Sequence, residues 1–307
     1  LSFVRDPDSA WPSLRAFLNK AVPRSVQRAT HVLADSLATK NDLIELFGTP
    51  AEKITVLYSG VEARFAPVRD QVEIDRVCAK YHLPRPFILS VGTLQPRKNY
   101  ARLIEAFAEL IKHPERSPSG AKSKDASVGD GASFDSTSFR SGRLTSDYYL
   151  VITGGKGWMY ESIFEQVKSL GLENRVHFPG FVDDADLPTL YSAANLFAYV
   201  SLYEGFGLPL LEAMACGTPV IASNVSSLPE VVGDVGLQVD PRDVADVTRA
   251  LRTMIEQSDV RATSIAAGLD RARTFTWEKA ARELLAIYDH ISVPKKKDRK
   301  NPGENRG

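Results

Sequence analysis

The residues best suited to chemistry lie in one dense run, SLYEGFGLPLLEAMACGTPV, which begins at position 201. Within it, Glu204 and Glu212 flank a turn that contains Gly205 and Gly207 and leads into Pro209. Glycine permits a tight turn and proline suits the first turn of a helix, so the spacing predicts a helix that begins at this turn. The unpaired N–H groups of such a helix suit a phosphate. We therefore expect a phosphate-binding cleft bordered by two carboxylates, one able to hold a ribose and the other a sugar.

A second loop carries two cations directly after a short apolar run, residues 87–91. Its sequence, GTLQPRKN, begins at Gly92 and contains Arg97 and Lys98. Loops at the carboxyl ends of parallel strands are where α/β folds bind ligands. Positive charge in that place suits a diphosphate and would stabilise it as a leaving group. This loop therefore predicts a diphosphate site.

Two weaker signals follow later apolar runs. A glycine-rich turn, TGGKGW, contains Gly154, but it has neither the GxGxxG nor the Walker pattern. Further along, Gly180, Phe181 and Val182 offer backbone groups and an aromatic face to a nucleobase. Both turns are candidate ligand contacts at the edge of a sheet.

Each of these assignments has a plainer alternative. Glu212 can serve its own helix as a capping group while Glu204 is merely solvated, and the basic loop can be an ordinary solvated loop. The turn at Gly154 can be a simple connection between a strand and a helix. Phe181 can pack in the core. The residues alone leave these alternatives open.

The elements that must position these residues follow a regular pattern from residue 87 onward. Short, nearly all-apolar runs alternate with stretches of helical period, which is typical of βαβ units around a parallel sheet buried on both faces. Upstream, similar elements cover too little chain for a Rossmann-like domain of roughly 100 to 150 residues. The fold class is therefore α/β, with one complete parallel-sheet domain and part of another. Strands are predicted at residues 30–34, 54–58, 87–91, 148–153, 176–178, 196–200, 219–222 and 236–239, and helices at residues 13–28, 39–47, 101–112 and 276–291.

Two segments have the composition of disordered chain. Residues 113–147 are rich in Ser, Gly, Lys and Asp, with few apolar side chains to bury, so we predict a disordered insertion. Residues 292–307 form a basic tail, which we expect to be solvated. The alternative is that the lysines of this tail contact an anionic membrane surface.

Charge and cysteine usage exclude several classes of function. The 38 basic and 38 acidic residues cancel, so a nucleic-acid partner is not expected. Cys78 and Cys216 are isolated and the five histidines have no ligand spacing, so neither a metal site nor another cofactor is expected. The chain shows no spanning segment and no signal-peptide pattern, and it begins at Leu1 rather than at a methionine. We expect a cytoplasmic protein with an N-terminal segment missing, with peripheral contact at the inner face of the membrane as an option.

Taken in order, these motifs resemble the donor half of the retaining glycosyltransferases of family four, the glycosyl transferases group 1. That half carries a Gly-xxx-Pro-Arg-Lys-Asn loop, a Gly-Gly-Lys-Gly turn, Gly-Phe-Val and two glutamates separated by seven residues. The most specific match is EGFGLPLLEAMACGTPVIAS. One departure is Ser59, which stands where the family usually has asparagine.

The resemblance implies a GT-B fold, in which two Rossmann-like domains face each other across a cleft. Residues 1–66 would then be the remainder of the N-terminal acceptor domain, and residues 67–275 the nucleotide-sugar donor domain with its insertion. The helix at residues 276–291 would cross back to the first domain.

The resemblance also implies roles for the site residues. Arg97 and Lys98 would bind the diphosphate, Glu212 the ribose hydroxyls and Glu204 the donor sugar, with no covalent nucleophile and no metal. Glu204, Arg97 and Lys98 are thus the predicted catalytic residues. The predicted donor-binding residues are Gly92, Arg97, Lys98, Gly154, Phe181, Val182, Glu204, Gly205, Phe206, Gly207, Leu208 and Glu212.

The form of the two main motifs is most similar to bacterial mannosyltransferases of surface polysaccharide synthesis. This similarity implies transfer of a hexose, with mannose from GDP-mannose as the first choice, from a GDP- or UDP-sugar to a glycan or lipid-linked acceptor. A GT-B sugar-nucleotide epimerase is an alternative, although the form of the run from Glu204 to Glu212 argues against it. A truncated, binding-only homologue is another, because a chain without most of its acceptor domain is expected to transfer little.

Overall fold

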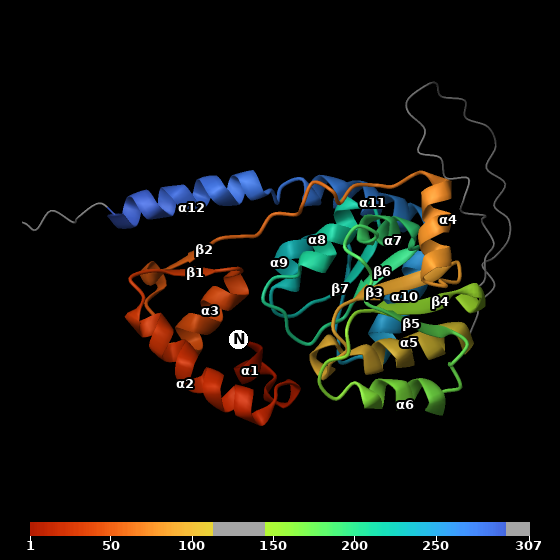
Figure 1. The fold of residues 1–307 in the computed structure, drawn as a ribbon, viewed down its shortest axis with the longest axis horizontal. Helices are drawn as coiled ribbons and strands as arrows, with labels where there is room; N and C mark the ends of the chain where they lie inside the picture. Colours follow the sequence, from red (N-terminus) through yellow and green to blue (C-terminus); the bar gives the residue numbers. More distant parts are fainter. Residues whose placement is uncertain (113–144, 293–307) are drawn as a thin grey trace, which may run out of the picture.

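The structure is a computed structural model that describes residues 1–112 and 145–292, and it has two lobes of unequal size (Figure 1). The larger lobe is built on a six-stranded sheet in the order β5-β4-β3-β6-β7-β8, in which every neighbouring pair is parallel. The chain runs outward from β3 to β5 and then returns to β6 beside β3. The strand order therefore reverses between β3 and β6, and such reversals are where α/β sheets bind ligands.

All six strands predicted for this sheet are present, and their ends differ from the prediction by at most two residues. The predicted α/β fold class is thereby confirmed. The strands are β3 (Phe87–Val91), β4 (Tyr149–Thr153), β5 (Val176–Gly180), β6 (Leu196–Tyr199), β7 (Val220–Ser223) and β8 (Leu237–Val239).

Helices cover both faces of the sheet because successive strand residues point to opposite sides. On one side, Leu89 and Phe197 belong to a core shared with α4, α7, α8 and α9. On the other, Ile88 and Leu196 belong to a core shared with α5, α6 and α10. The helices of this lobe are α4 (Gln71–Lys80), α5 (Tyr100–Lys112), α6 (Glu161–Ser169), α7 (Leu187–Ala193), α8 (Leu208–Ala215), α9 (Leu228–Val232), α10 (Val244–Glu256) and α11 (Ser258–Ala272).

The smaller lobe holds a two-stranded parallel sheet of β1 (Val32–Ala34) and β2 (Ile54–Val56). Both strands are shorter than predicted. Three helices accompany them: α1 (Ser2–Arg5), α2 (Pro12–Arg28) and α3 (Leu37–Phe47). Its core of buried side chains is small, consisting of Val26, Ala34, Leu43 and Ile54. Because so few apolar groups are buried, contacts with the larger lobe contribute to the order of this lobe.

The helix predicted at residues 276–291 is present as α12 (Trp277–Ser292), which extends from the larger lobe over the side of the smaller one (Figure 1). The segment that joins the lobes packs against its start. Val61 N donates to Phe275 O at 3.0 Å, and a Cβ on Gly60 would lie 2.2 Å from Trp277 N. Gly60 therefore permits a close approach of two backbones.

The prediction of a disordered insertion over residues 113–147 is wrong for its last three residues. Thr145–Asp147 form a 3-10 helix, and the buried Thr145 hydroxyl donates to Leu110 O at 3.1 Å in the last turn of α5. The rest of the insertion, residues 113–144, and the basic tail from residue 293 lie outside the described residues.

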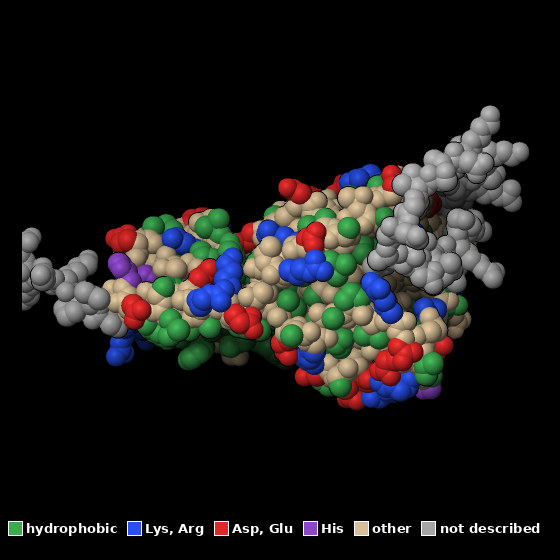
Figure 2. Space-filling view, turned by 90° about the horizontal axis from the view of Figure 1, so that it is seen from above, with side chains coloured by type: hydrophobic (Ala, Val, Ile, Leu, Met, Phe, Trp, Pro, Cys, Tyr) green, Lys and Arg blue, Asp and Glu red, His purple; other side chains and the backbone are tan. Residues whose placement is uncertain are grey.

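Figure 2 shows basic and acidic side chains interspersed over both lobes on the face seen from above. On that face no broad area carries a single sign of charge. Within the described ranges, no helix has both the length and the apolar character needed to cross a bilayer.

Candidate functional site

The loops that follow β3 and β6 meet at the reversal of strand order. Arg97 lies in a short 3-10 helix (Pro96–Lys98) of the first loop, and its Nη1 donates to Tyr203 O of the second at 2.5 Å. Asn99 ends this turn with a left-handed φ of 59° and donates to Val200 O at 3.0 Å. Side-chain donors of the first loop thus bind backbone carbonyls of the second and tie the two loops to each other.

Three charged side chains from these loops form what we call the cationic cluster, namely Arg97, Lys98 and Glu204. Arg97 lies 2.6 Å from Glu204 Oε2, and Lys98 Nζ donates to Glu204 Oε1 at 2.7 Å. Lys98 Nζ also donates to the hydroxyl of Tyr199 at 2.6 Å. The side chains of Lys98 and Glu204 are only 10% and 9% exposed, so the idea that Glu204 is merely solvated is wrong.

The charges of the cluster favour an anionic ligand. Burial would raise the pKa of Glu204, but Lys98 and Arg97 outweigh it and hold that pKa below its ordinary value. Burial lowers the pKa of Lys98, and the charge of Glu204 opposes this shift. Glu204 is therefore an anion, and the cluster sets two cationic groups against it. The excess of positive charge suits a diphosphate.

The predicted helix start beside the cluster is confirmed as α8, with Pro209 in its first turn. Gly207, at a φ of 121°, is the N-cap, and among the described residues no side chain caps the amides of α8. The turn is anchored from within because the buried Ser227 hydroxyl donates to Phe206 O at 2.7 Å. The first turn of α8 is therefore a fixed element whose N–H groups suit a phosphate.

Glu212, in the middle of α8, has partners different from those of Glu204. The hydroxyl of the fully buried Tyr191 donates to Glu212 Oε2 at 2.8 Å. Burial raises the pKa of Glu212, while this hydrogen bond and the charge of Arg64 oppose the shift. Asp184, in the loop after β5, also acts on Glu212 electrostatically. Glu212 and α7, the helix that follows the loop after β5, thus form a second part of the candidate site.

Gly92 and Gly154 have a packing role that sequence reasoning did not assign. Both have positive φ, 151° and 145°, and a Cβ on Gly154 would lie 2.2 Å from Gly92 O. The loops after β3 and β4 therefore touch through these glycines. Gly205 similarly faces the smaller lobe, since a Cβ there would lie 2.7 Å from Asp35 Oδ2.

The predicted apolar contacts divide into two groups. Phe181 is 70% exposed and Leu208 is 38% exposed, so the core alternative for Phe181 is wrong. Val182 and Phe206 are buried, and Phe206 stacks on Tyr58 with ring centroids 5.8 Å apart. Only the backbone of Val182 and Phe206 is therefore placed to touch a ligand.

Sequence reasoning missed Tyr191, Tyr199 and Arg64. Tyr199 had a local signal, since it is a polar group within an otherwise apolar strand. Across residues 1–112 and 145–292, no group of three or more His, Cys, Asp or Glu side chains is arranged to hold a metal ion.

The sequence of this chain matches a known protein family and several of its members. The family model for glycosyl transferases group 1 matches residues 134–271. The O-antigen chain mannosyltransferase B of Escherichia coli is 33% identical over 273 residues, which are 89% of this chain and 64% of that protein. The chain thus spans less than two thirds of this relative.

Solved structures show the same architecture. Sucrose-phosphate synthase from Thermosynechococcus elongatus matches with a TM-score of 0.69 at 26% identity, over 91% of this chain and 62% of its own. Anabaena HepE, solved with UDP and glucose, matches with a TM-score of 0.71 at 24% identity, over 90% of this chain and 67% of its own. The chain therefore contains a glycosyl transferases group 1 domain with the α/β fold of GT-B glycosyltransferases.

Proposed function

We propose that this chain is a retaining glycosyltransferase that moves mannose from GDP-mannose to a glycan or lipid-linked acceptor in bacterial surface polysaccharide synthesis. The observation that carries the proposal is the cationic cluster at the reversal of strand order, next to the uncapped start of α8. The similarity to a protein named as an O-antigen mannosyltransferase favours mannose as the sugar. The two main motifs also resemble those of bacterial mannosyltransferases, which supports GDP-mannose as the donor.

In the proposed complex the diphosphate lies between the cationic cluster and the first turn of α8. Arg97 and Lys98 neutralise the charge that grows on the diphosphate as it leaves, which lowers the barrier because both cations are already in place. Glu212 accepts hydrogen bonds from the ribose hydroxyls, and Phe181 faces the nucleobase. The backbone from Gly205 to Leu208 lies near the sugar and the phosphate.

The proposed transfer takes place on one face of the sugar. The bond between the anomeric carbon and the phosphate oxygen breaks, and a bond to the acceptor oxygen forms on the same side. The acceptor proton passes to the departing phosphate, so no enzyme nucleophile is needed. Glu204 contacts the donor sugar in this scheme, and its carboxylate also fixes the positions of Arg97 and Lys98.

Binding and transfer can be tested separately. Calorimetric titration of the full chain should show that GDP binds about tenfold more tightly than UDP, a difference of about 1.4 kcal/mol. Radiolabelled mannose should pass from GDP-mannose into lipid-linked glycans of a bacterial membrane extract, and NMR of the product should show the anomeric configuration of the donor. UDP-glucose is the control donor.

The outcomes distinguish the levels of the proposal. Transfer from UDP-glucose but not from GDP-mannose would support glycosyltransferase activity and reject GDP-mannose as the donor. A product of inverted configuration would reject retention. Absence of binding to both GDP and UDP would reject a nucleotide-sugar site.

A further inference from the structure

The loop after β5, residues 181–186, forms one border of the nucleotide end of the site, and we call it the β5 loop. It begins with the exposed Phe181 and continues with Val182, which is buried in the core. The helix that follows it, α7, carries Tyr191, whose hydroxyl donates to Glu212 Oε2 at 2.8 Å. The β5 loop thus lies between Phe181, which the proposed function sets against the nucleobase, and the helix that contacts Glu212.

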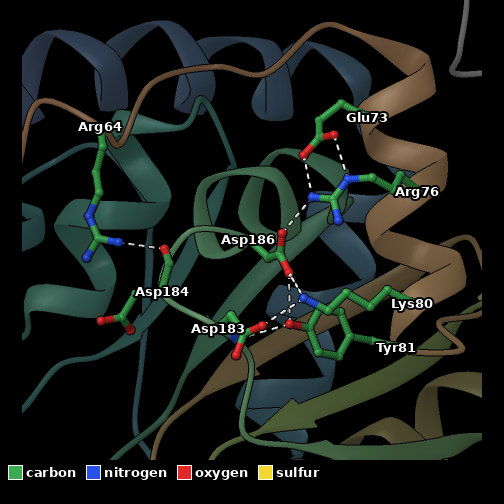
Figure 3. A network of polar contacts seen from close by, with 8 residues as sticks. All are labelled: Arg64, Glu73, Arg76, Lys80, Tyr81, Asp183, Asp184 and Asp186. Carbon is green, nitrogen blue, oxygen red and sulfur yellow. Dashed lines mark hydrogen bonds and ion pairs between the residues drawn. The ribbon is translucent and has the colours of Figure 1, made fainter.

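Asp186 ends the β5 loop and is only 4% exposed. Figure 3 shows its carboxylate directed at Arg76 and Lys80. Its Oδ1 accepts a hydrogen bond from Arg76 at 2.6 Å. Its Oδ2 accepts hydrogen bonds from Lys80 at 2.7 Å and from the hydroxyl of Tyr81 at 2.8 Å. Arg76 and Lys80 belong to α4, and Tyr81 is its C-cap. One carboxylate is thus held by three donors at the end of a single helix.

This is not the usual role of an aspartate in this position. Asp186 is the N-cap of α7, where an aspartate commonly accepts a hydrogen bond from the amides of the helix it precedes. In the described part of the chain, its carboxylate accepts none from α7. The carboxylate instead accepts hydrogen bonds from residues of α4 and its C-cap, so the side chain of Asp186 joins the β5 loop to α4.

The rest of the β5 loop is held from two sides. On the side of α4, the backbone N–H of Asp183 donates to the hydroxyl of Tyr81 at 3.1 Å, and Lys80 donates to Asp183 Oδ2 at 2.7 Å. From the segment that joins the lobes, Arg64 donates to Asp184 O at 2.5 Å (Figure 3). These contacts fix the loop backbone, which lowers the entropy lost when a ligand binds to it.

The charge state of Asp186 favours these hydrogen bonds. Burial would raise the pKa of Asp186, but the hydrogen bonds from Lys80, Arg76 and Tyr81 outweigh it and bring that pKa to about 2. Asp186 is therefore ionised throughout the neutral range. Protonation of Asp186 therefore does not break these hydrogen bonds in the neutral range.

We propose that Asp186 is a positioning residue for nucleotide recognition, because it holds the β5 loop against α4 so that Phe181 and the loop backbone meet the nucleobase. This inference rests on the proposed function. It concerns the nucleoside end of the donor and not the diphosphate, which the cationic cluster would bind.

The test uses the full chain, with GDP and inorganic pyrophosphate as the two probes in low-salt calorimetry. Asp186→Asn should weaken GDP binding by about tenfold, because a loosened loop must be ordered again on binding, and should leave pyrophosphate binding unchanged. Tyr81→Phe removes only the hydroxyl that bridges Asp183 and Asp186, and it should weaken GDP binding to a smaller extent. This milder variant keeps the test decisive if Asp186→Asn fails to fold.

Glu73→Gln is the matched control. Glu73 binds the same Arg76 guanidinium at 2.7 Å but lies on α4, outside the β5 loop. Its replacement should leave the binding of both probes unchanged.

Three results would overturn the inference. The first is unchanged GDP affinity in those variants, Asp186→Asn and Tyr81→Phe, that fold. The second is an equal loss of affinity for GDP and pyrophosphate, which indicates a general structural role. The third is a loss of GDP affinity in Glu73→Gln as large as that in Asp186→Asn and Tyr81→Phe. Failure of the unaltered chain to bind GDP or UDP would instead reject the proposed function.

Discussion

The ammonium group of Lys98 lies 2.7 Å from Oε1 of Glu204, although 106 positions separate the two residues in the chain. Strand order explains this proximity, because β3 and β6 are neighbours and the loops that leave them meet at one edge of the sheet. Both side chains are nearly buried, and charges attract more strongly there than in water. The same contact therefore bears on folding and on the affinity for an anion.

Replacing Lys98 with methionine keeps an unbranched side chain of nearly the same length and removes its charge. Glu204 would keep its ion pair with Arg97 but lose the one with Lys98. We therefore expect the free energy of unfolding to fall by about 1 to 3 kcal/mol. GDP affinity should fall by about tenfold or more, since a charge-assisted contact contributes about 1.5 to 3 kcal/mol. Urea denaturation and calorimetry measure the two effects.

Lys156→Met is the matched control for this variant. Lys156 is an exposed cation in the loop after β4, so its loss should change stability by no more than about 0.5 kcal/mol. If Lys98→Met binds GDP as tightly as the unaltered chain does, Lys98 is not part of the site.

Glu212 should give nucleotide binding a characteristic pH dependence. Because its pKa is raised, the folded chain holds the carboxyl proton of Glu212 more tightly than the unfolded chain does. Protonated Glu212 therefore favours folding, and this contribution to stability is lost as the pH rises through the folded pKa. Ribose binding has the opposite sign, because only the ionised carboxylate accepts through both oxygens. We expect GDP affinity to fall as the pH is lowered through the raised pKa of Glu212, above the ordinary glutamate value of about 4.3.

The diphosphate itself also gains a proton near pH 6, roughly the second pKa of a phosphate group. The informative quantity is therefore the ratio of GDP affinities in the unaltered chain and in Glu212→Gln, measured from acidic to neutral pH. The glutamine still offers an oxygen to Tyr191, which keeps the fold. A ratio that does not change with pH would contradict the ionised role of Glu212.

Much of this site could be predicted because its signals are local. The basic loop and the turn before α8 each follow an apolar run, and a parallel sheet brings the ends of such runs to one edge. The alternatives for Glu204 and Phe181 could not be decided in that way. The first depends on burial by a loop distant in the chain, and the second on whether the sheet edge leaves the ring in solvent.

The tertiary partners of the site could not be predicted at all. Tyr191 reaches Glu212 only because α7 and α8 pack on the same face of the sheet. Asp186 has the sequence position of a helix cap, and only the packing of α4 shows that its carboxylate is used elsewhere. Contacts of this kind depend on the arrangement of whole elements, which the local sequence does not encode.

Gly154 should be sensitive to the addition of a single methyl group. In Gly154→Ala, the new Cβ would lie 2.2 Å from Gly92 O at a φ of 145°. Either the loop after β4 moves or the strain remains, so we expect a loss of about 2 to 4 kcal/mol in the free energy of unfolding. Chemical denaturation of the full chain measures this loss.

The neighbouring Gly155 provides the control. A Cβ there would have no heavy atom within 4 Å among the described residues, so Gly155→Ala should change stability by no more than about 0.5 kcal/mol. Equal stability of the two alanine variants would show that the close approach of Gly92 and Gly154 does not constrain the fold.

Phe181 should matter for binding and not for folding. Its ring is 70% exposed, so Phe181→Ala removes little buried surface and should leave the melting temperature nearly unchanged. If the ring stacks on the nucleobase, its loss should weaken GDP binding by about 1 to 3 kcal/mol. Pyrophosphate binding should not change, because that probe has no base. Calorimetry with both probes provides the measurement, and Phe17→Ala, which removes a ring of 64% exposure from α2, is the control. GDP binding that is equally strong in Phe181→Ala and Phe17→Ala would place the base elsewhere on the chain.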